Sequence, residues 1–315
     1  MTNWLDKIKN SLRDTKAKLK NAFSKVQLDS PKDYWHSCKG CTKMMDKKQL
    51  KQNFYCCPNC SKPQIVSPRD RFQIFFDNGQ YEELNHKITT NHDPLDWEDL
   101  KKYKDKVKAA RKTYKQDSAV LCAEGFLNGS KVQAVVFNSQ FLGGSFGIPE
   151  SQVFLKAIDY SVENKLPFVV FVAGGGMRVT SGALSLMGMP KVVIGFNQLK
   201  ENKIPSISMF CDPLAGGLTC IFYMSDFSFA EDASTRVIFS GRKTIESVIG
   251  EKLDGKFGTA EHCMEKGFLD AIIPRSEHRE KISNLLSIML HQKQNLNSEQ
   301  NAEASMDTKR PISAA

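Results

Sequence analysis

The sequence contains no apolar segment long enough to cross a membrane. Residues 168–172 are apolar, but a membrane helix needs ~18 or more such residues in a row. The chain starts Met1-Thr2-Asn3-Trp4 and continues directly into charged residues, without the apolar core of a secretory signal. Its nine cysteines fit a reducing compartment better than a disulfide scaffold, because four of them have metal-ligand spacing. We therefore expect a cytoplasmic protein with no membrane span.

Motifs of several common enzyme classes are also absent. There is no G-x-x-x-x-G-K-[ST] phosphate loop, no strand–G-x-G-x-x-G–helix unit for dinucleotides and no G-x-S-x-G nucleophile elbow. The six histidines lie in polar or helical contexts and not at the ends of predicted strands: His36, His86, His92, His262, His278 and His291. The side chains therefore offer few candidates for acid–base or nucleophilic catalysis.

Four cysteines are the most informative residues present. Their spacing is Cys38-x2-Cys41-x15-Cys57-x2-Cys60. Each C-x-x-C pair presents two thiolates from one tight turn, and two such turns complete a tetrahedral all-thiolate site, which is the pattern of a zinc ribbon. A closed four-thiolate site leaves no open coordination position, so we expect a structural and not a catalytic zinc.

Two alternatives to this zinc assignment remain at the sequence level. Cys56 lies beside Cys57 and could compete for the fourth position. The four cysteines could also be free or disulfide-bonded, an interpretation that the spacing disfavours.

The positive charge of the chain is unevenly distributed. The net charge is +9, and lysines concentrate in residues 1–62 and again in residues 101–115. Basic surface attracts phosphates, whether in nucleic acid, in anionic lipid or in coenzyme A. The alternative is a solvated face that serves only solubility. We favour coenzyme A phosphates or a protein partner, with nucleic acid as the weaker alternative.

The pattern of the first 115 residues divides them into three parts. Residues 2–27 have loosely helical spacing, so residues 1–33 are expected to hold a basic N-terminal helix. Residues 34–66 form the zinc ribbon. Ser67-Pro68 then opens a helix by its cap and proline position, and helical segments are expected to continue to about residue 115, with a break at residues 91–94.

From residue 118 the pattern is that of an α/β domain, expected to span residues 67–292. Residues 119–125 and 131–138 are predicted strands around Asn128-Gly129, a hairpin turn signal. Further strands are predicted at residues 166–173, 204–211, 227–230, 237–239 and 271–274, and helices at residues 152–164, 181–196 with a bend at Pro190, 218–224, 244–249, 259–266 and 279–292. Repetition of strand, glycine turn and helix indicates parallel strands. Residues 293–315 are polar and predicted to be a disordered tail.

Three glycine clusters follow predicted strands: Gly143-Gly144, Gly174-Gly175-Gly176 and Gly216-Gly217. Backbone N–H groups at such turns are unpaired, and glycine lets a substrate carbonyl approach them closely, so two turns can make an oxyanion hole. Each cluster alone could be a simple tight turn. Nearby, Cys211 and Cys220 are interpreted as small buried thiols and Asp212-Pro213 as a turn and helix cap.

Several longer motifs occur in a fixed order along the chain. They are Pro68-Arg69-Asp70-Arg71, Lys101-Lys102-Tyr103-Lys104-Asp105, Phe141-Leu142-Gly143-Gly144-Ser145-Phe146-Gly147, Gly175-Gly176-Met177-Arg178, Asp212-Pro213-Leu214-Ala215-Gly216-Gly217 and Gly267-Phe268-Leu269-Asp270. Together with the four-cysteine spacing, the chain from Trp4 to about Met289 resembles the β subunit of the carboxyltransferase of bacterial and plastid acetyl-CoA carboxylase.

The resemblance implies a crotonase-like (ClpP/crotonase) spiral of ββα units behind the zinc ribbon. It implies transfer of a carboxyl group from carboxybiotin, carried on a biotin carboxyl carrier protein, to acetyl-CoA, giving malonyl-CoA for fatty acid biosynthesis. It also implies a partner α subunit in an α2β2 assembly. When the family's site residues are transferred to the matching positions of this sequence, the resemblance implies catalytic oxyanion donors at Gly175-Gly176-Met177 and Gly216-Gly217. It implies cofactor contacts from Gly143, Gly144 and Arg178. Which turn serves which substrate stays open.

The motifs depart from the family pattern at three places. After Gly147 the chain reads Ile148-Pro149-Glu150-Ser151, which loses a glycine and adds a proline. The segments 174–181 and 238–245 differ too. These changes leave two alternatives: a divergent paralogue acting on another acyl-CoA as a decarboxylase or hydratase, or a non-catalytic binding or scaffold protein.

Overall fold

The computed structural model describes residues 34–291. By its contacts the chain divides into two compact units, Met1–Gln64 and Ile65–Ala315, and each is described by itself. The predicted helix at residues 2–27 and the predicted disordered tail at residues 293–315 lie outside the described residues. No helix within residues 34–291 is both long and apolar enough to cross a membrane.

The first unit is built around a two-stranded antiparallel sheet. Strand β1 (Trp35–Ser37) pairs with β2 (Met44–Asp46), and α3 (Lys47–Gln52) follows directly. Its core consists of Cys38, Met45, Leu50 and Cys57. Because residues 34–64 bury so few apolar side chains, this part of the chain needs a further source of stability, which small domains commonly take from a metal.

The second unit contains a seven-stranded sheet with the order β3-β4-β5-β6-β7-β8-β9. The strands are β3 (Tyr81–Leu84), β4 (Val120–Leu127), β5 (Ser130–Phe137), β6 (Phe168–Gly174), β7 (Ser206–Leu214), β8 (Phe227–Ala230) and β9 (Ala271–Ile272). The first three strands are antiparallel and the others follow in parallel. The parallel part places the ends of β5, β6 and β7 at one edge of the sheet.

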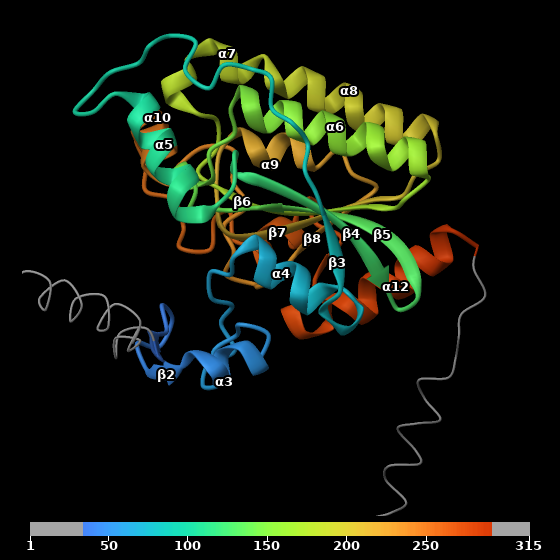
Figure 1. Ribbon diagram of the computed structural model, residues 1–315. Coiled ribbons are helices and arrows are strands. Elements are labelled where there is room, and N and C mark those ends of the chain that lie inside the picture. Colours follow the sequence, from blue (N-terminus) through green and yellow to red (C-terminus); the bar gives the residue numbers. More distant parts are fainter. Residues whose placement is uncertain (1–33, 292–315) are drawn as a thin grey trace, which may run out of the picture. The chain divides into compact units, whose positions relative to one another are not determined.

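Helices cover both faces of this sheet (Figure 1). One face carries α6 (Ile148–Asn164), α8 (Gly188–Glu201) and α9 (Gly217–Phe222), and the other carries α4 (Pro68–Phe75) and α12 (His278–Met289). Aromatic rings join the layers edge to face: Phe154 of α6 lies 5.3 Å from Phe168, and Phe75 of α4 lies 5.1 Å from Phe171. Strand β6 is buried along its whole length, as expected for a strand covered on both sides.

The remaining elements are short or peripheral. They are η1 (Asp77–Gly79), α5 (Tyr103–Tyr114), η2 (Leu142–Gly144), η3 (Val179–Ser181), α7 (Ala183–Leu186), α10 (Arg242–Ile249), α11 (Ala260–Glu265) and η4 (Arg275–Glu277).

Two local predictions are confirmed in detail. Asn128 and Gly129 have φ of 48° and 82° and join β4 to β5, as a two-residue hairpin turn requires. Ser67 caps α4 by accepting a hydrogen bond from the N–H of Asp70, with Pro68 in the first turn.

The prediction that helices continue to residue 115 is wrong between α4 and α5. Strand β3 lies there and pairs with β4, a non-local partner that local spacing does not reveal. It is followed by residues 85–102, which form neither helix nor strand and which we call the strap. The strap runs across α6 (Figure 1), where the N–H of Thr89 donates to Gln152 Oε1 at 3.0 Å and Lys156 Nζ donates to the carbonyl of Lys87 at 2.7 Å.

Three further predictions need correction. The helix expected over residues 181–196 is broken at Met187 into α7 and α8, because Pro190 lies in the first turn of α8, where no N–H is required. Residues 237–239 form no strand, and the N–H of Val237 instead donates to the carbonyl of Gly258. Asp212-Pro213 belongs to the end of β7 and caps no helix, whereas Gly216 is the N-cap of α9.

Candidate functional site

The four predicted metal ligands converge in the first unit. The sulfur atoms of Cys38, Cys41, Cys57 and Cys60 lie within 4.8 Å of one another. The Sγ atoms of Cys38 and Cys60 are 3.6 Å apart, and those of Cys41 and Cys57 are 3.7 Å apart. Thiolates around zinc, with Zn–S of about 2.3 Å in a tetrahedron, lie about 3.8 Å apart. The donor set therefore fits a zinc ion, and the ribbon holds a structural zinc.

Backbone hydrogen bonds favour a thiolate at Cys38. Burial alone would raise the pKa of Cys38, but the backbone N–H groups of Cys41 and Gly40 lower it to about 6. Gln64 Nε2 also donates to Cys38 Sγ at 3.4 Å, while Gln64 Oε1 accepts from the N–H of Lys39. Sequence reasoning missed Gln64, because a glutamine after the second knuckle carries no motif signal. Gln64 orients a ligand and does not bind the metal.

Cys56 does not belong to the cluster. Its thiol donates to the carbonyl of Phe54 at 3.8 Å instead. The alternative in which Cys56 replaces a ligand is therefore not supported. All nine cysteines lie in the described part of the chain, and none forms a disulfide.

In the second unit, the three glycine turns meet at one edge of the sheet. Gly144 and Gly174 touch so closely that a Cβ on Gly174 would lie 2.1 Å from the carbonyl oxygen of Gly144. A Cβ on Gly176 would lie 3.0 Å from the carbonyl oxygen of Ala215. No side chain fits between these backbones, which explains glycine at 144, 174 and 176.

Backbone hydrogen bonds hold the turns in register. The N–H of Gly175 donates to the carbonyl of Gly143 at 2.9 Å, and the N–H of Ala215 donates to that of Gly174 at 3.1 Å. The N–H of Gly216 donates to the carbonyl of Ile238 at 3.0 Å. The predicted donors Gly175 and Gly216 thus use their own N–H groups to fix the shape of the turns.

Other N–H groups of the same turns are available. Within residues 34–291, the N–H groups of Gly176, Met177 and Gly217 donate to no atom. Gly217 is the first residue of α9, where an unpaired N–H and the helix dipole combine. The Met177 side chain lies against Gly217: a Cβ added to Gly217 would be 3.0 Å from Met177 Cγ. The arrangement offers backbone donors to an anionic oxygen, and no histidine of the described residues hydrogen-bonds to it.

A buried ion pair supports these turns. Arg178 Nη2 lies 2.8 Å from Glu150 Oε1, with side chains 3% and 0% exposed. Glu150 also accepts from the N–H of Gly147 at 3.0 Å, at the start of α6, and from the N–H of Ala119 at 3.0 Å, before β4. Arg178 Nε donates to Ser145 Oγ at 3.0 Å. One carboxylate therefore ties the loop after β5 to the loop after β6.

This ion pair joins a departure from the motifs to a residue that matches them. Glu150 stands in the altered segment 148–151, whereas Arg178 belongs to the matching motif Gly175-Gly176-Met177-Arg178. Burial alone would lower the pKa of Arg178, but the negative charge of Glu150 raises it, so the guanidinium stays charged. The prediction that Arg178 contacts a cofactor stays untested, and its buried position favours a role in positioning the turn.

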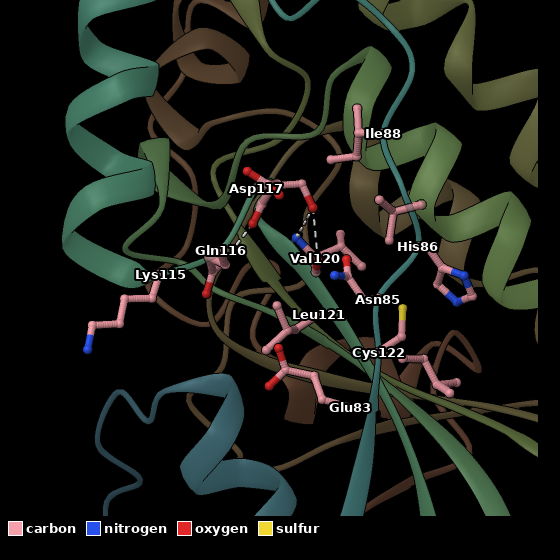
Figure 2. A pocket seen from close by; sticks show the side chains of 13 residues that line it. Glu83, Asn85, His86, Ile88, Lys115, Gln116, Asp117, Val120, Leu121 and Cys122 are labelled. Carbon is pink, nitrogen blue, oxygen red and sulfur yellow. Dashed lines mark hydrogen bonds between the residues drawn. The ribbon is translucent and has the colours of Figure 1, made fainter.

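A separate cavity of about 120 Å³ lies beside the end of β3 and the start of β4 (Figure 2). Its polar groups bind one another: Gln116 Nε2 donates to the carbonyl of Ser118 at 2.6 Å, and Ser118 Oγ bridges to Val120. Cys122 lines it, but burial raises the pKa of this thiol, which makes it a poor nucleophile. Gln116 Oε1 accepts a hydrogen bond from Asn138 Nδ2 at 3.0 Å, which holds the chain after β5 in position. We therefore interpret this cavity as structural and not as a second reactive centre.

Comparison with protein families matches both units. Residues 35–60 match the acetyl-CoA carboxylase zinc finger domain, and residues 69–314 match the carboxyl transferase domain. The acetyl-coenzyme A carboxylase carboxyl transferase subunit beta of Pelagibacter ubique (strain HTCC1062) is 37% identical over 314 residues, covering 99% of both chains. The protein of the same name from Christiangramia forsetii is 37% identical over 265 residues, covering 84% of this chain and 92% of the relative.

Solved structures share the fold at lower identity. A transcarboxylase 12S structure with hydrolysed methylmalonyl-coenzyme A superimposes with a TM-score of 0.58 at 21% identity, over 76% of this chain and 42% of that chain. The Pseudomonas malonate decarboxylase MdcD-MdcE hetero-dimer superimposes with a TM-score of 0.53 at 18% identity, over 77% of this chain and 94% of that chain. The expected crotonase-like fold with an N-terminal zinc ribbon is confirmed. The chain belongs to the family of acetyl-CoA carboxylase carboxyl transferase β subunits.

Proposed function

We propose that the three glycine turns form the acyl-CoA site of a carboxyl transfer reaction. Enzymes of this family take the carboxyl group from carboxybiotin, and the acceptor here is the methyl carbon of acetyl-CoA, giving malonyl-CoA. The observation that carries the proposal is the set of unpaired N–H groups at Gly176, Met177 and Gly217, gathered where two strands end. The methyl proton passes to the biotin nitrogen from which the carboxyl group is released, and the thioester enolate that attacks this carboxyl group has a negative oxygen that needs such donors.

In this site the residues have different tasks. The N–H groups of Gly176, Met177 and Gly217 stabilise negative oxygen, while Gly175 and Gly216 shape the turns through their own hydrogen bonds. Gly143 and Gly144 supply the adjoining wall, since the carbonyl of Gly143 accepts from Gly175. The donors are fixed before the substrate binds, so little reorganisation is needed when the enolate forms. The zinc of the ribbon takes no part in the chemistry, because its four protein ligands leave no open coordination position.

The chain acts as part of an acetyl-CoA carboxylase complex, and we propose a carboxyltransferase α subunit as its direct partner. Apolar side chains lie exposed on the elements that follow the 174–178 turn: Val179 is 78% exposed and Met187 is 62% exposed. Leu184 and Leu186 of the same stretch are 41% and 52% exposed, and a group of exposed apolar side chains beside a site supports an interface with a partner. A partner placed there covers the open side of the turns, in an α2β2 assembly, and admits the biotin of the carrier protein.

We further propose the domain limits expected from the sequence, with the ribbon at residues 34–66 and the carboxyltransferase domain at residues 67–292. That none of the nine cysteines forms a disulfide supports residence in a reducing compartment, the cytoplasm.

Carboxyl transfer in the reverse direction tests the proposal. Malonyl-CoA and a soluble biotin analogue are incubated with this chain alone, with an α subunit alone and with both. We expect carboxybiotin analogue and acetyl-CoA only when both subunits are present. Breakdown of malonyl-CoA without biotin or partner would contradict the proposal and indicate a decarboxylase. A complex that binds acyl-CoA but transfers no carboxyl group would favour a non-catalytic role.

A further inference from the structure

Met177 has a side chain whose direction is fixed by the backbone on either side of it. The N–H of Phe146 donates to the carbonyl of Gly176, and the N–H of Arg178 donates to the carbonyl of Phe146, both at 2.8 Å. This bridge makes the segment locally strand-like, and neighbouring side chains of a strand point to opposite sides. Because Arg178 is buried against Glu150 on one side, Met177 points to the other side, where α9 begins.

The Met177 side chain extends as far as Gly217, the first residue of α9. A Cβ added to Gly217 would lie 3.0 Å from Met177 Cγ and 3.3 Å from Met177 Sδ. The same point lies 3.3 Å from Cε of Met189, which belongs to the first turn of α8. Met177 and Met189, which we call the methionine pair, therefore fill the space beside Gly217 from two sides.

Packing of the second unit holds the methionine pair in place. Helix α8 begins at Gly188, where an added Cβ would lie 2.9 Å from Ser151 Cβ, so the start of this helix packs directly on α6. Both methionines are partly buried and pack against the apolar core of the second unit. Part of each side chain therefore stays accessible, and it presents an apolar surface beside the glycine turns.

The methionine pair lies between two sets of unpaired backbone donors. Within residues 34–291, the N–H groups of Gly176 and Met177 are unpaired at one end of the Met177 side chain, and that of Gly217 is unpaired at its other end. By standard covalent geometry, the Cβ position of Gly217 is about 2.5 Å from its own N atom. A thioester oxygen that accepts from both sets therefore lies alongside the Met177 side chain. The carbon atoms attached to this thioester group then contact the methionine pair.

We propose that Met177 and Met189 are specificity-determining residues, which restrict the acyl group of the substrate to two carbons. This inference rests on the proposed function, because it takes the thioester oxygen to be bound at the glycine turns. A propionyl group has one more methyl group on the carbon that accepts the carboxyl group, and this methyl group would need the volume that the methionine pair fills. An apolar pocket discriminates against one extra methylene by about 10- to 200-fold.

Transfer from two thioesters tests this inference in the complex of the full chain with its α subunit. Malonyl-CoA and methylmalonyl-CoA differ by one methyl group on the carbon that carries the carboxyl group. Each is incubated separately with the soluble biotin analogue, and kcat/KM is measured. We expect the wild type to prefer malonyl-CoA by at least about tenfold. Met177→Ala should reduce this preference by about tenfold, because kcat/KM for methylmalonyl-CoA rises relative to that for malonyl-CoA.

Three further variants separate side-chain volume from other effects. Met189→Ala should also reduce the preference, and it leaves every backbone N–H of the glycine turns in its own residue. Met177→Leu keeps a side chain of similar volume and should keep the wild-type preference. The control Met264→Ala removes the same side chain from α11, where it is 41% exposed and belongs to none of the glycine turns. This control should transfer from both thioesters as the wild type does.

The outcomes distinguish this inference from the proposed function. Equal kcat/KM for the two thioesters in the wild type would overturn the inference, while the observed transfer would support the proposed function. An unchanged preference in both Met177→Ala and Met189→Ala would overturn it in the same way. Absence of transfer from malonyl-CoA in the wild-type complex would contradict the proposed function, and the inference with it.

Discussion

The buried ion pair between Glu150 and Arg178 should be one of the most sensitive points of the second unit. The change Glu150→Gln keeps the shape of the side chain but leaves the guanidinium of Arg178 charged and 3% exposed without its counter-ion. Breaking such a pair by removing one partner costs about 3–5 kcal/mol. Since domains of this kind unfold with about 5–15 kcal/mol, the variant should lose a large part of its stability.

The matched control is Glu83→Gln. Glu83 pairs with Arg69 at 2.9 Å, but the two side chains are 37% and 39% exposed. Water screens this pair, so its loss should cost no more than about 1 kcal/mol. Urea unfolding of the full chain, followed by circular dichroism, measures both variants against the wild type.

The double variant Glu150→Gln/Arg178→Met provides the decisive comparison. It removes the uncompensated charge, so it should be more stable than Glu150→Gln alone, giving a favourable coupling energy in the mutant cycle. A loss in Glu150→Gln no greater than in Glu83→Gln, or a double variant less stable than the sum of the single changes, would refute the account of this ion pair.

Two further predictions concern the zinc and the acid range. Cys57→Ser should release zinc and unfold the ribbon, whereas Cys56→Ser should keep full zinc content because Cys56 lies outside the cluster; equal metal content by mass spectrometry in both would contradict the site. Burial lowers the pKa of His278 to about 3 from an ordinary 6.5, so the unfolded chain binds a proton that the folded chain does not between these pH values, and stability falls as pH falls through that window. The variant His278→Gln cannot take up this proton. Between pH 6 and 4 its unfolding free energy should therefore fall less steeply than that of the wild type, with slopes that differ by up to about 1.4 kcal/mol per pH unit. Parallel profiles of the two proteins would contradict the buried neutral histidine.

Features determined by short stretches of chain could be predicted from the sequence. The metal site depends on two pairs of cysteines whose spacing alone brings the sulfur atoms together. The β4–β5 hairpin depends on Asn128-Gly129, and the start of α4 on Ser67-Pro68. The three glycine turns could be placed because each directly follows a recognisable strand or strand pair.

Features that depend on partners far along the chain could not be predicted. Strand β3 has four residues, none of them fully buried, and exists because it pairs with β4 about forty residues later. Glu150 was visible only as a departure from a motif, and nothing in the sequence connects it to Arg178. Their contact arises because β5 and β6 are parallel neighbours, which brings the loops after both strands together. The identity of the unpaired N–H donors likewise required the hydrogen bonds of the folded turns.

The most direct test of the glycine-turn site is the rate of carboxyl transfer by Gly216→Val in the complex with the α subunit. Gly216 has φ of 75° and ψ of −155°, a conformation essentially restricted to glycine, and its Cβ would lie 3.2 Å from Gly176 Cα. The control is Gly250→Ala, at φ of 73° with no atom within 4 Å of the new Cβ. The account predicts that kcat of Gly216→Val falls by about 100-fold or more, with zinc content and acyl-CoA binding kept, while Gly250→Ala transfers normally. Full transfer activity in Gly216→Val would contradict a site built from these backbone turns.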